Sequence, residues 1–162
     1  MSRATRTRLL LFAAATTFLA ATGLAAQHPS VAPPSQWAPA PLLFPRGARI
    51  AVISGDPFKP ESLTTQLSFP DGYRMPPHFH PFDEHVEVLQ GTFLVGMGDK
   101  FDLKKMQPLA VGDTATAPAG VHHYAEAKGP TIISVSVMGP YVIDYVNPND
   151  RPWNQSTFPY GY

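Results

Sequence analysis

Short β-forming segments that end at glycine or proline dominate the sequence from residue 48 to residue 146. The segments are apolar and β-branched, as in "ARIAVIS", or alternate between apolar and polar residues, as in "LTTQLSF", and both patterns are typical of strands. The expected strands are residues 48–54, 63–69, 85–91, 92–98, 113–120, 122–128, 131–139 and 141–146. Only "FDLKKM" (101–106) is expected to be helical, for one or two turns. Many short strands joined by close turns predict an all-β sandwich or barrel.

Residues 1–26 have the three-part layout of a secretory signal peptide. Three arginines and no acidic residue precede an apolar run from Leu9 to about Ala21, and small residues lead to a predicted cleavage point near Ala25 or Ala26. The run is too short and too rich in alanine to favour a membrane span; the alternatives are an amphipathic core helix and a retained anchor. We therefore predict a secreted or periplasmic protein that has no membrane association after cleavage.

Charge and cysteine content limit which partners the protein can bind and what can stabilise its fold. The chain carries 12 basic and 12 acidic side chains, and removal of residues 1–26 takes away three basic residues and leaves a net charge of −3. A mildly acidic domain is not expected to bind nucleic acid. The chain has no cysteine, so the fold must depend on its core, on association between copies or on a bound metal.

Proline-rich segments flank the expected barrel. Residues 27–41 are predicted to form an extended arm, because proline fixes φ and lacks an amide donor. Trp37 and the apolar run "LLF" (42–44) predict that part of this region docks on apolar surface. Residues 147–162 form a C-terminal tail, which is expected either to be disordered or to cross the barrel or a partner subunit as a strap.

Histidine and glutamate are concentrated in the stretch "GYRMPPHFHPFDEHVEVLQG" (72–91). His78 and His80 lie two residues apart, so on a strand both side chains point to the same face. The segment "PFD" then predicts a turn, and a hairpin can place Glu84 opposite the two histidines. Two imidazoles and a carboxylate are a recurring ligand set for divalent transition metals. The alternative is a polar surface strand that is rich in histidine.

This stretch and a second cluster at residues 112–127 resemble the two sequence motifs of the cupin superfamily. The first motif is matched at every position by Gly72-x5-His78-x-His80-x3-Glu84-x6-Gly91, and Gly112-x5-Pro118-x-Gly120-x2-His123 is similar to the second. Ala127 stands where the family usually has asparagine, and His122 stands where proline is common. The resemblance implies a small jelly-roll β-barrel that spans residues 42–146. It also implies that His78, His80, Glu84 and His123 bind one divalent transition metal ion, which could be Mn, Fe, Ni, Cu or Zn.

Several other residues compete for these roles. Strand alternation places Glu87 on the face opposite Glu84, and His122 on the face opposite His123, so neither is expected to bind the metal. His85 is expected to point away from the metal, and Asp83 is expected in a turn. Seven further side chains could line an apolar pocket, although core packing is the alternative for each: Met75, Phe82, Phe93, Met97, Tyr124, Met138 and Tyr141.

A complete ligand set with open coordination positions predicts a metalloenzyme that acts on a small organic molecule, as a dioxygenase, isomerase, decarboxylase or lyase. The sequence identifies no individual catalytic residue. It contains no G-x-S-x-G elbow, P-loop, Rossmann fingerprint or H-E-x-x-H. The alternative is a non-catalytic periplasmic protein that binds a small molecule or a metal. A homodimer is expected, because an open jelly-roll edge favours strand addition.

Overall fold

The structure is a computed structural model that describes residues 29–154. Within this range the elements are η1 (Pro34–Gln36), β1 (Ala38–Pro39), β2 (Arg49–Ser54), β3 (Ser62–Phe69), β4 (Arg74–Phe79), β5 (Glu84–Met97), η2 (Leu103–Lys105), β6 (Gln107–Leu109), β7 (Thr114–Ala117), β8 (His123–Met138), β9 (Asp144–Tyr145), η3 (Pro148–Asp150) and η4 (Pro152–Asn154). The predicted signal peptide and the last eight residues of the tail lie outside the described residues. In the described part, no helix is long and apolar enough to cross a membrane.

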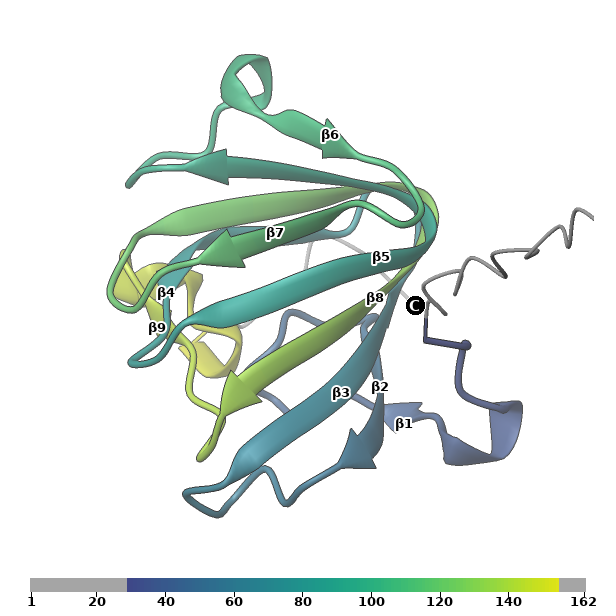
Figure 1. Ribbon diagram of the computed structural model, residues 1–162. Helices are drawn as coiled ribbons and strands as arrows, with labels where there is room; N and C mark the ends of the chain where they lie inside the picture. The colour runs from purple at the N-terminus through teal and green to yellow at the C-terminus, as the bar shows by residue number, and fades with distance from the viewer. Residues whose placement is uncertain (1–28, 155–162) are drawn as a thin grey trace, which may run out of the picture.

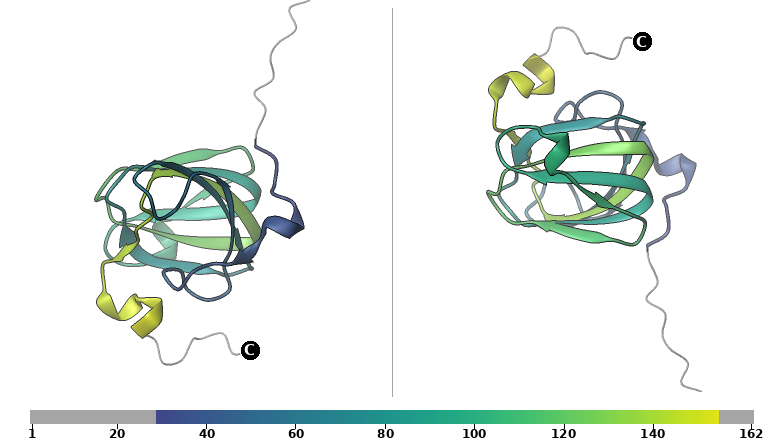
Figure 2. Two further views of the ribbon diagram at one scale, coloured as in Figure 1. Left: turned by 90° about the horizontal axis from the view of Figure 1, so that it is seen from below. Right: turned by 90° about the horizontal axis from the view of Figure 1, so that it is seen from above.

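The strands form one sheet that curls around a common interior (Figures 1 and 2). Along one path the strand order is β1-β2-β3-β8-β4-β9, and β5 joins the sheet through β8 while it also pairs with β6 and β7. The paired strands are antiparallel. The molecule is therefore an all-β jelly roll, as the sequence predicts.

The two longest strands, β5 and β8, run side by side and bend together (Figure 1). Their first and second halves were expected as separate strands that meet at Gly91 and at Gly129-Pro130, and this expectation is wrong. Each is one continuous strand, and the register shifts between Val88 and Thr92 mark irregular pairing near the bend. Gly91 and Gly129 have φ values of +77° and +75°, which favour glycine. Because of the bend, β5 and β8 both contribute to the two walls of the barrel.

Strand β3 shows how the interior is filled. Its side chains alternate, and Leu63, Leu67 and Phe69 are at most 2% exposed on the inner face. Gln66 points to the outer face but is also buried, because the N-terminal arm covers it. The Gln66 side chain accepts a hydrogen bond from the Ala32 amide (2.7 Å) and donates one to the Ser30 carbonyl (2.8 Å). Through these two bonds the arm docks on the barrel, and the contact at Gln66 is polar rather than the apolar docking that Trp37 and the "LLF" run predict.

The "LLF" run divides between the core and the surface. Phe44 is 3% exposed within the core, whereas Leu42 is 65% exposed. The predicted short helix is confirmed as the single turn η2, where the Asp102 side chain accepts a hydrogen bond from the Lys104 amide. The segment 141–146 pairs as a strand only over Asp144–Tyr145, so most of it is a loop that passes beside β4.

Candidate metal centre

Three histidines from two segments of the chain meet at one end of the barrel. His78 on β4 is directly opposite His123, the first residue of β8, and their ring centroids are 4.2 Å apart. His80 follows β4 and is held close by a hydrogen bond from the Gly120 amide to its carbonyl. One nitrogen from each imidazole lies within 4.8 Å of the other two. The three residues are each at most 8% exposed, so they form a buried cluster.

Backbone carbonyls fix the orientation of all three rings. The Nδ1 atom of His78 lies 2.7 Å from the Pro76 carbonyl, that of His80 2.6 Å from the Val142 carbonyl, and that of His123 2.9 Å from the Val121 carbonyl. A carbonyl oxygen only accepts, so each Nδ1 carries the proton and donates it. The Nε2 atom of each neutral ring therefore keeps its lone pair, which is the atom that a metal would bind.

Glu84 begins β5 and places its carboxylate beside two of these nitrogens. Its Oε1 lies 3.4 Å from His80 Nε2, and its Oε2 lies 3.6 Å from His123 Nε2. Both distances exceed those of good hydrogen bonds, and both nitrogens are buried without a hydrogen-bond partner. Buried polar atoms are rarely left in this state. The gap between the carboxylate and the imidazoles therefore has the chemistry of a cation site.

The residues of the cluster differ in the direction in which their pKa values are shifted. Burial, together with the imidazoles of His123 and His80, lowers the pKa of His78 to about 3. Burial also lowers the pKa of His80, but Glu84 outweighs it and the net shift is upward. Burial raises the pKa of Glu84, but His123 and His80 outweigh it and hold that pKa well below its ordinary value. An ionised Glu84 carboxylate and a His78 ring that stays neutral suit a divalent cation.

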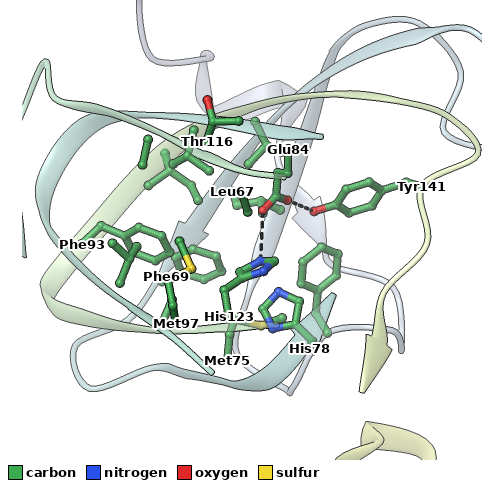
Figure 3. A pocket seen from close by; sticks show the side chains of 18 residues that line it. Leu67, Phe69, Met75, His78, Glu84, Phe93, Met97, Thr116, His123 and Tyr141 are labelled. Carbon is green, nitrogen blue, oxygen red and sulfur yellow. Dashed lines mark hydrogen bonds and ion pairs between the residues drawn. The ribbon is translucent and has the colours of Figure 1, made fainter. Parts of the chain in front are cut away.

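Tyr141 completes the surroundings of Glu84. Its hydroxyl donates a hydrogen bond of 2.9 Å to Glu84 Oε1, and its ring stacks on His80 with centroids 5.7 Å apart. Figure 3 shows the Glu84 carboxylate between the His123 ring and the Tyr141 hydroxyl. The sequence suggests Tyr141 only as a pocket-lining residue. Nothing in the spacing indicates this bond, because the two residues lie 57 positions apart.

The other polar residues of the two motifs lie outside this cluster. His85 is exposed, and its Nδ1 lies 2.9 Å from the Thr116 hydroxyl. His122 is turned to the surface, where its Nδ1 lies 2.6 Å from a carboxylate oxygen of Asp99. Asp83 accepts a hydrogen bond from the Ala119 amide and so connects the two loops that follow the motif strands. Glu87 pairs in register with Thr114 and does not line the cavity beside the histidines.

A small cavity of about 50 Å³ adjoins the cluster and reaches into the barrel. Four of the seven predicted lining residues do line it: Met75, Phe93, Met97 and Tyr141. The other three do not. Phe82 and Met138 lie on an outer groove instead, and Tyr124 is fully buried with its ring beside Gly96 and Phe101.

Comparison with known proteins supports the fold. No family model and no curated protein matches the sequence. An acetylacetone dioxygenase from Acinetobacter johnsonii is similar over 78% of this chain and 82% of its own, with 13% identity and a TM-score of 0.58. An oxalate oxidase is similar over 67% of this chain and 60% of its own, with 22% identity and a TM-score of 0.51. An RmlC-like cupin from Shewanella frigidimarina NCIMB 400 is similar over 57% of this chain and 76% of its own, with 22% identity and a TM-score of 0.48.

The topology and the neighbours agree with the two sequence motifs. The chain has the cupin fold, a small jelly roll with a three-histidine group at one end of its interior.

Proposed function

We propose that the protein is an exported cupin that binds one divalent transition metal ion through His78, His80, Glu84 and His123. The observation that carries this proposal is the set of three buried imidazoles whose Nδ1 atoms face carbonyls. Their Nε2 atoms are thereby left free to bind a cation, and two of them have no other partner. Histidine and carboxylate ligands fit Mn, Fe, Ni, Cu or Zn.

We further propose that the bound metal acts on a small organic molecule, in a reaction of the dioxygenase, isomerase, decarboxylase or lyase type. The metal would supply Lewis-acid or redox chemistry when bound. The residues of the chain orient the ligands, exclude water through an apolar wall, and hold the Glu84 carboxylate through Tyr141. Among the neighbours with TM-scores above 0.5, the oxalate oxidase and the acetylacetone dioxygenase are named as enzymes, which favours catalysis.

Metal analysis of natively purified protein tests the first part. We expect about one transition metal ion per chain. His78→Ala should lose it, because that substitution removes one of three convergent nitrogens, whereas His122→Ala should retain it, because His122 faces the surface beside Asp99. Protein that neither contains metal nor takes it up on titration contradicts the proposal. If a metal is found, its identity guides the next experiment. Zinc would favour Lewis-acid chemistry, whereas iron or copper would favour redox chemistry, which an oxygen-consumption assay tests.

A second function follows from the scarcity of acid–base groups. Among the described residues that line the cavity, Glu84, Tyr141, His78 and His123 are the only titratable ones, and all four belong to the proposed centre or touch it. A periplasmic protein that binds a small molecule or metal without turnover would need no more than this. Metal-loaded protein that binds ligands reversibly, but turns over none of the substrate classes above, would favour this second function.

Export is tested separately. We expect the mature protein in the periplasmic or secreted fraction, with a new N-terminus near Ala26 or Gln27. Recovery of intact chain beginning at residue 1 in the cytosol contradicts it.

A further inference from the structure

The cavity beside the metal centre is polar at one end and apolar over the rest of its wall. The polar groups are His78, His123, Glu84 and the Tyr141 hydroxyl, and the hydroxyl is already bonded to Glu84. The rest of the wall is formed by aliphatic, aromatic and methionine side chains, among them Leu67, Phe69, Phe93 and Met97.

Thr116 does not change this distribution. It lines the cavity, but its hydroxyl lies 2.9 Å from His85 Nδ1. Figure 3 shows that hydroxyl pointing away from the cavity. None of the described lining residues is a lysine or an arginine. A second charge or a hydroxyl among Leu67, Phe69 and Phe93, which are each at most 6% exposed, would therefore be buried without a partner. That costs roughly 1–3 kcal/mol for a neutral polar group and more for a charge.

The size of the cavity sets a second limit. A cavity of about 50 Å³ accommodates roughly three to five water molecules, since one water needs about 10–15 Å³ by the same measure. An organic molecule of only a few non-hydrogen atoms fits without rearrangement. Phe69 and Phe93 stack at 5.9 Å and, with Met97, lie on the side of the His123 ring away from Tyr141 (Figure 3). The body of a bound molecule would lie against this group.

From the size of the cavity and the distribution of its polar groups, we infer the substrate class of the proposed metal centre. It is a short molecule with a single oxygen-donor head, such as one carboxylate or enolate, and an uncharged apolar body. The head lies at the metal beside Glu84, and the body lies between Leu67, Phe69 and Phe93. This inference rests on the proposed function, because the head needs a metal to bind. It excludes dicarboxylates, phosphorylated compounds and sugars as good ligands.

Ligand titration of the Co²⁺-loaded protein, followed by the visible absorption of the metal, tests the inference. The probes are acetate, propionate and butyrate as one series, and succinate as the match for butyrate, because both have four carbons and differ at the far end. We expect affinity to rise about fourfold per added methylene until the cavity is full. Succinate should bind at least about tenfold more weakly than butyrate, because its second carboxylate finds no cation in the wall.

Two variants sharpen the test. Phe93→Leu enlarges the cavity while it keeps an apolar side chain, and it should move the best chain length upward. Val111→Ala is the control, because Val111 is 62% exposed and does not line the cavity; it should leave the order of affinities unchanged. Succinate binding as tightly as butyrate, a flat affinity series, or no response to any carboxylate overturns the inference. Failure to take up Co²⁺ would instead contradict the proposed function, so the two failures are distinct.

Discussion

Acidification of the metal-free protein should destabilise it through one residue, His78. Burial and the neighbouring imidazoles of His123 and His80 lower the pKa of His78 to about 3, from an ordinary value of 6.5. Below pH 6.5 the unfolded chain binds a proton at this position and the folded chain does not. Stability therefore rises with pH between about 3 and 6.5 and falls as the solution is acidified through that range.

The magnitude follows from the difference between the two states. Each pH unit below 6.5 costs about 1.4 kcal/mol as long as His78 stays neutral in the folded chain. By pH 4.5 the contribution of His78 alone lowers the free energy of unfolding by about 2.7 kcal/mol relative to its value above pH 7. His80 contributes with the opposite sign at higher pH, because its pKa is raised and its protonation stabilises the folded chain as the pH falls toward 6.5. Well below 6.5 it is protonated in both states and adds no slope. Glu84 is ionised in both states until about pH 5, because its folded pKa is lowered.

Urea denaturation of chelator-treated protein between pH 7.5 and 4.5 measures this slope. His78→Gln should remove it, because the new side chain does not titrate, and His122→Gln should retain it, because His122 lies at the surface. If His78→Gln does not fold, an NMR titration of the His78 ring in the metal-free protein provides the same information. The same slope in His78→Gln, or a His78 ring that titrates near 6.5, would refute the reasoning.

Three other perturbations have definite expected outcomes. Gly96→Ala should destabilise the fold by about 1–3 kcal/mol, because the new Cβ would lie 2.3 Å from the buried Tyr124 ring. Thermal or urea denaturation measures this loss, and an unchanged stability would contradict the packing argument. Tyr141→Phe removes the donor to Glu84 and should weaken metal binding by roughly tenfold at unchanged stoichiometry, measured by competition with a chelator; an unchanged Kd would show that the bond does not position Glu84. Metal-loaded protein should lose its metal as the pH falls below about 6, because a proton then competes with the metal at His80, whose pKa is raised on balance; dialysis and metal analysis test this, and full retention at pH 4.5 would argue against histidine ligands.

Local periodicity accounts for much of what the sequence predicts correctly. The alternating residues of β3 place Leu63, Leu67 and Phe69 inside because side chains on a strand alternate between two faces. The same rule brings His78 near His80 and separates Glu84 from Glu87. Spacing after the Pro118 turn also distinguishes His123, which joins the cluster, from its surface neighbour His122. These features depend on a few neighbouring residues, so they can be read along the chain.

The same local rules fail where the sheet closes. Gly91 and Gly129 look like strand ends in the sequence, because glycine and proline usually mark turns. In the folded chain both lie within long strands that bend, since pairing between β5 and β8 continues on either side. Only contacts between distant segments decide whether a glycine ends a strand or bends it.

The all-β class can be read from the chain because it depends on residue type and short-range spacing, and the resemblance to the two cupin motifs identifies the three histidines that meet. Only the folded chain shows that Tyr141 bonds Glu84 across 57 residues and that carbonyls such as that of Val142 orient the rings. It also decided that the adjoining cavity is small and polar only at one end. These features arise when the curled sheet brings separate segments into contact, and no local pattern encodes which distant groups will then face one another.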